Sequence, residues 1–319
     1  MKICITGGLG YLGSRLTEAL LSRGHEVSIV DSALYGNHLS SGTRNKIRIV
    51  NCNVLNPSKA AVDAVKDSDV VIHLAAIVGD QACDLRKSDA VDINLNGTRV
   101  IAKLCENFEK RMIYASTCSV YGASQKTLTE KSKVLPLSIY ALTKYAGEKV
   151  LSESRVKYVI LRMGTLFGFS PRMRFDLVVN TFVARALEHK EISVFGGSQF
   201  RPLLHVEDAC DFYCAVIDQG FFGREIYNIG GINTKITDVA LEVQRILGAQ
   251  VRVIDELRDP RNYRVDSGHA IDTFKLHFKR DVAFGIEEMT RLIRQNGIEN
   301  FEAPIYSNAE RLRTLALTK

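Results

Sequence analysis

The N-terminal segment has the pattern that most restricts how this 319-residue chain can fold. An apolar run at residues 2–6 is followed at once by GGLGYLG at residues 7–13, which predicts a buried strand that ends in a glycine turn. Residues 14–23 then have apolar side chains at helical spacing, and a second apolar run at residues 26–30 ends on Asp31. This order of strand, glycine turn, helix, strand and acid is the one that a dinucleotide site requires.

Each part of this pattern has a chemical reason. Glycine lets the backbone approach a pyrophosphate without a Cβ in the way, and the free N–H groups at the start of the helix bind the phosphates. We therefore expect Gly7, Gly10, Tyr11 and Leu12 to contact the cofactor. Asp31 would accept hydrogen bonds from the adenosine ribose and repel a 2′-phosphate, and no Lys or Arg follows it within ten residues, which favours NAD over NADP. The alternative is a glycine turn that only tightens a strand–helix join, and the flanking elements and Asp31 argue against it.

Strands and helices continue to alternate over the first half of the chain. Further strands are expected at residues 47–51, 69–76 and 111–115, helices at residues 57–66, 88–108 and 138–154, and loops at residues 32–46 and 77–86. This alternation predicts an α/β fold with a doubly wound parallel sheet of the Rossmann type, whose ligands bind at the carboxyl ends of the strands. Residues that follow these strands are expected to contact the cofactor: Asn53, Val54, Leu74, Ala75 and Ala76.

A tyrosine and a lysine, Tyr140 and Lys144, stand four residues apart on the helix predicted at residues 138–154. Residues at this spacing share one helix face. Lys144 beside Tyr140, with a cationic nicotinamide close by, would lower the pKa of the tyrosine from its ordinary value near ~10, so that it could act as a base at neutral pH. The motif occurs by chance in many helices, and its position after a complete nucleotide-binding pattern gives it weight.

The pattern changes after residue 162, where longer loops are expected at residues 164–174 and 191–200. We place an NAD-binding domain at residues 1–165, with its sheet completed by later segments at about 200–230, and a smaller, mainly substrate-binding α/β part at residues 166–319. A strand that ends at a helix start is expected at residues 203–208, with Asp208 as the N-cap, and an amphipathic helix at residues 285–297. Arginines in or near the loops suit a phosphorylated substrate, although any single one of them could be a solvated surface charge: Arg172, Arg174, Arg201, Arg258 and Arg261.

Composition narrows the class of protein. Hydrophobic residues make up 46% of the chain and charged residues 24%, as in ordinary globular proteins, and the formal net charge of +6 is spread along the chain rather than gathered in a basic stripe. This argues against a nucleic-acid partner. No apolar run approaches the length of a membrane span, the chain opens on a strand rather than a signal peptide, and seven cysteines lie mostly inside apolar runs without a second ligand pair. We therefore expect a cytoplasmic protein without a metal site.

Taken together, these motifs resemble one family over nearly the whole chain: the extended short-chain dehydrogenases/reductases that act on nucleotide sugars. The residues that carry the resemblance are TGGLGYLG at 6–13, Asp31, HLAA at 73–76, NLNGT at 94–98, STCSVYG at 116–122, YALTK at 140–144, residues 162–168, residues 201–208 and YNIG at 227–230. The resemblance implies that Tyr140 is the catalytic base, that Lys144 binds the nicotinamide ribose, and that Thr117 holds the sugar O4. Asn94 would support the active site from the cofactor side.

The resemblance also implies a substrate and an assembly. The substrate would be a nucleotide-diphosphate sugar, with Arg201 on the diphosphate and Asn180 as a further contact. By their positions, the other residues expected at the substrate are Cys118, Ser119, Thr165, Arg174 and Arg261. Members of the family commonly form homodimers through the helices that correspond here to residues 97–108 and 138–154.

Three departures from the family's patterns narrow the expected reaction. Members that remove water across C5–C6, or decarboxylate a uronic acid, have an acidic residue just after the catalytic Thr or Ser, where this chain has Cys118 and Ser119. Members that epimerise at C3 and C5 use a cysteine one place later than Cys118. Thr165 stands where UDP-glucose 4-epimerases have asparagine, and residues 166–174 resemble a subgroup that includes GDP-heptose oxidoreductases.

The favoured hypothesis is an NAD-dependent nucleotide-sugar 4-epimerase that acts through a 4-keto intermediate. An NAD-dependent 4-dehydrogenase, for example of GDP-heptose, uses the same first half-reaction and is the alternative. A non-catalytic NAD-binding sensor on the same fold is the alternative of another class, and the intact Tyr140, Lys144 and Thr117 argue against it.

Overall fold

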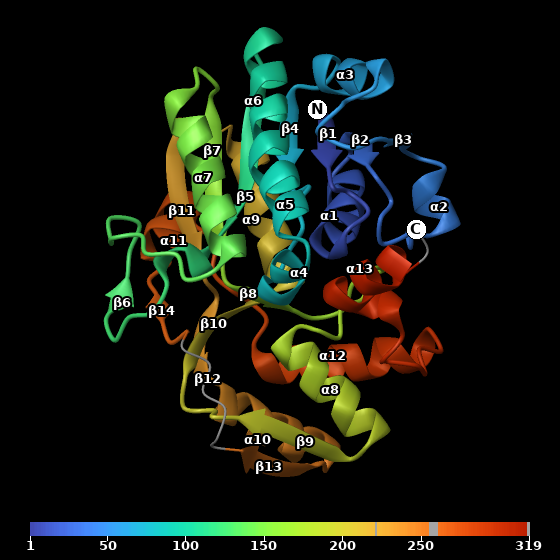
Figure 1. The fold of residues 1–319 in the computed structure, drawn as a ribbon, viewed down its shortest axis with the longest axis vertical. Coiled ribbons are helices and arrows are strands. Elements are labelled where there is room, and N and C mark those ends of the chain that lie inside the picture. The colour runs from blue at the N-terminus through green and yellow to red at the C-terminus, as the bar shows by residue number, and fades with distance from the viewer. Residues whose placement is uncertain (221, 255–260, 318–319) are drawn as a thin grey trace.

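The computed structural model describes residues 1–220, 222–254 and 261–317, and it is built on a seven-stranded sheet in the order β11-β7-β5-β4-β1-β2-β3 (Figure 1). Every neighbouring pair of strands in this sheet is parallel. Its strands are β1 (Lys2–Thr6), β2 (Glu26–Asp31), β3 (Arg48–Asn51), β4 (Val70–His73), β5 (Arg111–Thr117), β7 (Tyr158–Met163) and β11 (Glu225–Ile229). The predicted α/β fold with a Rossmann-type parallel sheet is confirmed.

Helices cover both faces of the sheet and divide its core in two. α1 (Tyr11–Ser22) and α9 (Val206–Gln219) pack on one face, and α3 (Lys59–Lys66), α6 (Gly97–Asn107) and α7 (Ile139–Glu153) pack on the other. Because side chains alternate along a strand, Ile3 and Ile5 face the first layer while Cys4 faces the second. Burial on both faces is the reason that these strands are continuous apolar runs in the sequence.

A smaller part follows β7 in the chain and lies below the large sheet in Figure 1. It contains a three-stranded sheet, β12-β10-β8, and a parallel two-stranded sheet, β13-β9. Its elements are β8 (Thr165–Phe167), α8 (Val178–Glu188), β9 (Glu191–Phe195), β10 (Phe200–His205), β12 (Ile232–Lys235), α10 (Ile236–Leu247), β13 (Gln250–Ile254) and α12 (Val282–Gln295). Between β10 and β12 the chain returns to the large sheet through α9 and the edge strand β11.

The remaining elements are short or lie at the margins of the sheets. They are α2 (Ser41–Arg44), α4 (Asp80–Leu85), α5 (Lys87–Val91), a π-helical turn (Asp92–Asn96), a 3₁₀ turn (Cys118–Tyr121), β6 (Thr127–Leu128), β14 (Arg264–Val265), α11 (Gly268–Phe274), a 3₁₀ turn (Pro304–Tyr306) and α13 (Asn308–Leu317).

Several sequence-based expectations about local structure were wrong. The expected loops at residues 32–46, 77–86, 164–174 and 191–200 contain α2, α4, β8 and β9, and the single helix expected at residues 88–108 is α5, a π-helical turn and α6. β8 pairs with β10 and β9 pairs with β13, and in each case the partner is distant in the sequence. α4 packs against α13. Local periodicity in the sequence therefore does not predict these elements.

Asp208 is not the N-cap of α9. The cap is His205, whose ring Nδ1 accepts a hydrogen bond from the Glu207 N–H at 3.3 Å. Asp208 lies in the first turn instead, where its carboxylate accepts hydrogen bonds from the backbone N–H of Lys279 and from the Arg280 guanidinium, the latter at 2.6 Å. The carboxylate therefore joins α9 to the segment before α12.

A buried ion pair joins α7 to strand β7 of the large sheet. Arg162 on β7 donates two hydrogen bonds to the carboxylate of Glu148 on α7, at 2.9 and 2.6 Å, and both side chains are 3% exposed. Ser116 on β5 donates a third, at 2.5 Å, and Arg162 also donates to the Tyr121 hydroxyl at 2.8 Å. The two charges of this network, on Arg162 and Glu148, are thus paired with each other. The network fixes α7 against the end of β5.

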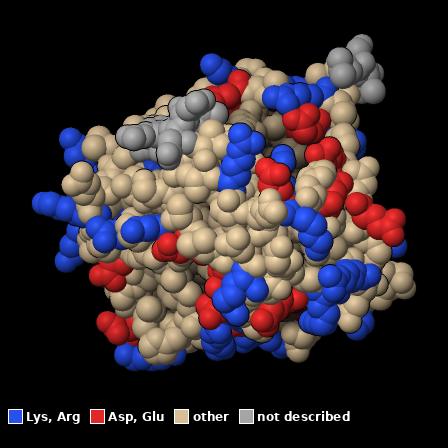
Figure 2. Space-filling view, turned by 90° about the horizontal axis from the view of Figure 1, so that it is seen from below, with Lys and Arg blue, Asp and Glu red and all other residues tan. Residues whose placement is uncertain are grey.

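The surface of the smaller part has charges of both signs. Figure 2 shows Lys and Arg side chains interspersed with Asp and Glu on its lower face. Some of these charges pair within one helix, as Arg245 and Glu242 do on α10 at 2.6 Å. Across residues 1–220, 222–254 and 261–317, no helix combines the length and the apolar character needed to cross a membrane.

We predict that Glu148→Ala destabilises the fold by about 3–5 kcal/mol, because it leaves the Arg162 guanidinium buried without its partner. Urea denaturation of the two proteins measures the loss. The control is Glu242→Ala, which breaks the solvent-exposed pair with Arg245 and is expected to cost at most about 1 kcal/mol. Equal losses in both variants would contradict a structural role for the buried pair.

Candidate active site

A cleft of about 270 Å³ opens at the carboxyl ends of the parallel strands, where the segments after β1, β2, β3, β4 and β5 converge. Twelve of the thirteen residues expected to bind the cofactor line it: Gly7, Gly10, Tyr11, Leu12, Asp31, Asn53, Val54, Leu74, Ala75, Ala76, Tyr140 and Lys144. The exception is Asn94. Residues that lie far apart in the sequence are therefore brought to one site, as the order of the strands predicts.

The glycine turn forms the floor of this cleft. Gly7 has φ +77°, and a Cβ on it would lie 2.6 Å from the backbone nitrogen of Ala75. A Cβ on Gly13 would lie 2.3 Å from the Gly7 carbonyl oxygen. The N-cap of α1, Gly10, makes no side-chain capping bond, so the first N–H groups of the helix face the cleft unblocked. This backbone cradle fits the diphosphate of a dinucleotide.

Asp31 is fixed at the end of β2 by two backbone groups. Its carboxylate accepts hydrogen bonds from the Leu9 N–H at 3.0 Å and from the Ala33 N–H at 2.8 Å. Burial raises the pKa of Asp31, and these two bonds oppose the shift. The carboxylate therefore ties β2 to the glycine turn, and Asp31 lines the cleft at the end of β2.

The three residues expected to carry the chemistry, Thr117, Tyr140 and Lys144, all line the cleft. Burial raises the pKa of Tyr140, with a smaller contribution of the same sign from Cys83, while Arg174 and the Thr117 hydroxyl lower it. The chain's own groups therefore do not produce the lowered tyrosine pKa that the spacing suggested. The reason is that Tyr140 lies in a dry site, where a phenolate loses its hydration.

Lys144 is almost completely buried, and burial lowers its pKa to about 7, opposed by Glu148 one turn further along α7. Its Nζ lies 4.2 Å from the centroid of the Tyr114 ring, a position that favours the charged form through a cation–π contact. The Tyr114 hydroxyl donates a hydrogen bond to the Lys144 carbonyl oxygen at 3.2 Å. Tyr114 thus contacts Lys144 at both its ammonium group and its backbone carbonyl.

Asn94 lies behind the cleft rather than on its wall. Its side chain accepts a hydrogen bond from the Ile77 N–H at 2.7 Å and donates to the Ile77 carbonyl at 3.0 Å and to the Thr143 hydroxyl at 3.1 Å. It sits in the π-helical turn, a distortion common at functional sites. Asn94 therefore joins the loop after β4 to the helix that carries Tyr140 and Lys144.

Some of the residues expected at the substrate line the cleft and others do not. Thr117, Ser119, Thr165 and Arg174 line the cleft. Cys118 is fully buried, and its thiol donates to the Arg162 carbonyl at 3.1 Å. Ser119, the residue after it, is the side chain that the turn presents to the cleft.

Asn180 is also fully buried and does not line the cleft. Its amide accepts a hydrogen bond from the Gly168 N–H at 3.1 Å and donates to the Tyr11 hydroxyl at 3.2 Å and to the Arg174 carbonyl at 2.9 Å. These bonds join α8 to the first residue of α1. A substrate contact by Asn180 would require an exchange of these bonds, so that role stays a prediction.

Arg201 and Arg261 come from the smaller part and lie outside the cleft. Arg201 donates to the carbonyl oxygens of Phe200, at 2.9 Å, and of Arg261, and its guanidinium lies 5.7 Å from the Tyr263 ring. Arg261 forms an ion pair with Asp80, the first residue of α4, so it bridges the smaller part to the large one. Arg258 lies outside the described residues.

The sequence motifs missed part of the cleft wall. Leu34 and Tyr35 come from the loop after β2, Leu177 precedes α8, and Asn308 begins α13. Arg172, which the sequence marked only as one of several loop arginines, lines the cleft beside them. Leu34, Tyr35, Leu177 and Asn308 stand in none of the motifs singled out in the sequence, so only the folded chain identifies them.

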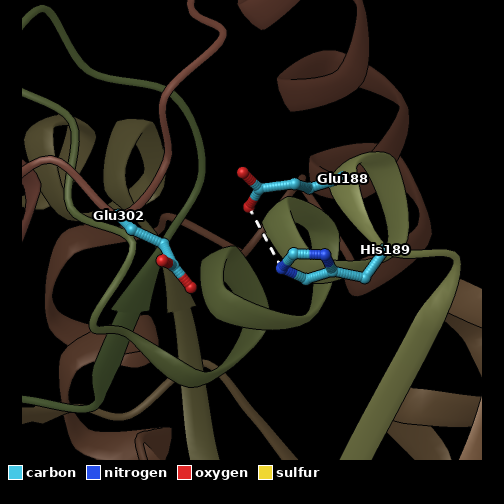
Figure 3. Close-up of side chains that lie close together, drawn as sticks. All are labelled: Glu188, His189 and Glu302. Atoms are coloured by element: carbon cyan, nitrogen blue, oxygen red, sulfur yellow. Dashed lines mark ion pairs between the residues drawn. The ribbon is translucent and has the colours of Figure 1, made fainter.

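Within the described ranges, one group of three side chains could hold a metal ion: Glu188, His189 and Glu302. Figure 3 shows Glu188 and His189 paired at the end of α8, with Glu302 approaching from a separate segment. All three are exposed, and none lines the cleft. Exposed acidic groups often gather without binding an ion, so we assign no site to them.

We predict that Gly7→Ala abolishes binding of NAD, because the added Cβ would collide with the backbone of Ala75. Gly24→Ala is the matched control, since Gly24 has a similar φ of +79° but nothing within 4 Å of the added Cβ. It is expected to lose only about 1 kcal/mol of stability and to bind NAD as before. Calorimetric titration with NAD separates the two, and undiminished binding by Gly7→Ala would contradict the assigned role of the turn.

Comparisons with known proteins agree with an NAD-binding site in this cleft. Residues 3–230 match the model of the NAD dependent epimerase/dehydratase family. The chain is 30% identical over 272 residues to the UDP-N-acetyl-alpha-D-glucosaminuronate decarboxylase of Bacillus cytotoxicus, covering 79% of this chain and 82% of that protein. It is 29% identical over 267 residues to the UDP-glucuronate 4-epimerase of Thermodesulfobacterium geofontis, covering 78% and 81%.

A solved structure extends the comparison to the fold. The UDP-glucuronic acid 4-epimerase from Bacillus cereus, crystallised with UDP-glucuronic acid and NAD, has a TM-score of 0.81 and 25% identity, over 93% of this chain and 100% of that one. The chain therefore belongs to the NAD-dependent epimerase/dehydratase family of extended short-chain dehydrogenases/reductases, and its cofactor is NAD.

Proposed function

We propose that this protein is an NAD-dependent nucleotide-sugar 4-epimerase. The observation that carries the proposal is the composition of the cleft: Thr117, Tyr140 and Lys144 line it, while Asp31 is the one carboxylate among its described lining residues. Asp31 is held by the glycine turn at the end of β2. The cleft thus has the groups that a C4 oxidation and reduction need, without an acid beside them for a second reaction.

In the proposed mechanism, Tyr140 removes the proton from the C4 hydroxyl, and Thr117 orients that hydroxyl by a hydrogen bond. NAD, when bound in the cleft, would supply the hydride acceptor for C4 and then the hydride donor. Once the 4-keto sugar has turned its other face, Tyr140 gives its proton back to O4 as C4 is reduced, so protons and electrons balance over the cycle. Lys144 supports the tyrosine and binds the nicotinamide ribose.

The effect of burial on the pKa values of Tyr140 and Lys144 explains how the two side chains act together. Burial raises the pKa of Tyr140 and lowers that of Lys144 to about 7, so the chain's own groups favour the neutral pair. A positive charge beside Tyr140, such as that of the oxidised nicotinamide, shifts this balance towards the phenolate. Proton removal is in this way coupled to the presence of the oxidised cofactor.

The residues after Thr117 argue against dehydration and decarboxylation. These reactions need an acid or base near C5, and the position next to Thr117 in the cleft is Ser119, because Cys118 points into the core. A hydroxyl that lies 3.3 Å from the Tyr263 hydroxyl is a poor substitute for a carboxylate. We therefore favour epimerisation, although one relative is named as a decarboxylase.

The proposed substrate is a nucleoside-diphosphate sugar. Arg174 lines the cleft, and Arg201 and Arg261 lie next to each other in the smaller part, where guanidinium groups suit a diphosphate. Two of the related epimerases, from T. geofontis and B. cereus, are named for UDP-glucuronate, and the B. cereus enzyme was crystallised with it. A UDP-uronic acid is accordingly the first sugar to test.

We further propose a homodimer that forms through α6 and α7. Leu142 on α7 is 56% exposed, and two more apolar side chains in the segment before α7, Leu135 and Leu137, are also exposed. An apolar group on the surface of this helix fits a contact with a second copy. Light scattering of the purified protein measures the assembly.

We predict that Tyr140→Phe loses turnover by a factor of at least about 10², the usual contribution of a positioned general base, and still binds nucleotide sugar and NAD. Conversion is measured by proton NMR of the sugar, and binding by calorimetry. A matched control is Tyr145→Phe on the same helix, which lies outside the described lining of the cleft. Unchanged turnover in Tyr140→Phe would contradict the role of Tyr140 as the catalytic base.

A panel of UDP-, GDP-, CDP- and dTDP-sugars, including UDP-glucuronic acid, tests the reaction itself. Sugar with inverted C4 and no net NADH identifies an epimerase. Stoichiometric NADH with a keto sugar identifies the alternative, a 4-dehydrogenase. Loss of carbon dioxide or water from the sugar would contradict the argument from Cys118 and Ser119.

A further inference from the structure

α13 joins two loops on opposite sides of the cofactor cleft. The Asn308 side-chain amide donates a hydrogen bond to the Val78 carbonyl at 2.9 Å, and the Arg311 Nε donates to the Leu34 carbonyl at 3.2 Å. Val78 belongs to the loop after β4 and Leu34 to the loop after β2, and both line the cleft. In Figure 1, α13 lies beside α4 and the end of the sheet that carries β2. It falls outside residues 3–230, which match the family model.

The strand order shows what this helix crosses. β1 lies between β4 and β2 in the sheet, so the glycine turn after β1 lies between the two loops that α13 joins. That turn is the backbone cradle for the cofactor diphosphate. A link from Val78 to Leu34 therefore spans the middle of the dinucleotide site, and Asn308 itself lines the cleft there.

Asn308 also positions a cation on the cleft wall. Its side-chain oxygen accepts a hydrogen bond from Arg172 at 2.8 Å, and the Arg172 guanidinium lies 4.5 Å from the centroid of the Tyr35 ring, on the loop after β2. Arg172 is 2% exposed, and its Nε and the Tyr35 hydroxyl are buried polar atoms without a hydrogen-bond partner in the described chain. Buried groups of this kind are rare unless a ligand completes them, and an anionic ligand oxygen would do so.

Apolar contacts hold α13 in this position. Ala309 and Leu312 belong to a buried cluster with Ile77, Ala82 and Cys83, next to Leu34 and Tyr140. The Asn308 N–H donates to the Asp176 carboxylate at 2.9 Å, which also anchors the start of the helix to the segment before α8. Moving α13 away from the cleft would break all of these contacts at once.

We propose that α13 is a further part of the cofactor-binding site and keeps NAD bound between turnovers. Release of the dinucleotide requires the loops after β2 and β4 to separate, and α13 opposes that separation. Given the proposed 4-epimerase activity, this device suits the reaction, because the hydride returns to the same sugar and no cofactor exchange is needed. A dehydrogenase would have to separate these two loops in every cycle to exchange its cofactor.

The test is the rate at which bound cofactor leaves. The protein is loaded with NADH and mixed with excess NAD, and the loss of bound-NADH fluorescence is recorded in a stopped-flow instrument. The variant Asn308→Ala/Arg311→Ala removes both bridging hydrogen bonds and is expected to release NADH roughly tenfold faster. Arg313→Ala is the control, because Arg313 is exposed and pairs with Glu310 on the same helix, and it should release NADH at the rate of the unchanged protein.

Equal release rates in the double variant and the control would overturn the proposal. Hydrogen exchange on the unchanged protein gives a second test that does not depend on the folding of a variant. The amides of α13 should exchange more slowly when NAD is bound, and exchange that NAD does not alter would also overturn it. Both measurements are independent of the sugar assay, so a failure of the proposed 4-epimerase activity would be seen separately.

Discussion

The close approach of the glycine turn after β1 to the loop after β4 is the constraint on which the rest of the site depends. A single Cβ at Gly7 would come within 2.6 Å of the Ala75 backbone, so these two segments meet with no side chain between them. The start of α1 is thereby held at the sheet edge with its N–H groups free, and Asp31 bonds to the same turn through the Leu9 N–H. The cofactor site is consequently made of backbone, whose geometry the sheet determines.

Burial also determines how readily Tyr140 and Lys144 carry a charge. Lys144 is almost completely buried and Tyr140 partly buried, which opposes charge on either of them, and the lowered pKa of Lys144, about 7, lies close to neutral pH. Tyr114 beneath Lys144 and Glu148 one turn away are the protein groups that restore charge on the lysine.

The sequence was sufficient for the large sheet and for most of the residues that line the cleft, because strands buried on both faces are continuous apolar runs and the glycine turn and the Tyr140–Lys144 pair each lie within one local unit. It was insufficient for β8, β9 and α4, which depend on partners distant in the chain. Side-chain directions were harder to predict than positions. Cys118 and Asn180 fall where a substrate contact is plausible, yet both use their hydrogen bonds inside the protein, whereas Asn308 lines the cleft without standing in a motif. A residue's orientation depends on neighbours from other elements, and a single sequence does not reveal them.

Relatives of this chain are named as a 4-epimerase, a decarboxylase and a dehydratase, so the shared fold does not select the outcome of the reaction. In the mechanism that we propose, two features of this chain bear on the fate of the sugar once C4 is oxidised. The side chain next to Thr117 in the cleft is the hydroxyl of Ser119, which leaves the C5 proton and a C6 carboxylate without an acid or base partner at that place. The second is α13, which bonds to the loops on both sides of the cleft and in our proposal opposes cofactor exchange, so that the hydride taken from C4 would stay in the cleft. A keto sugar that loses nothing and remains beside its own hydride has one productive course, which is reduction back to the alcohol on either face.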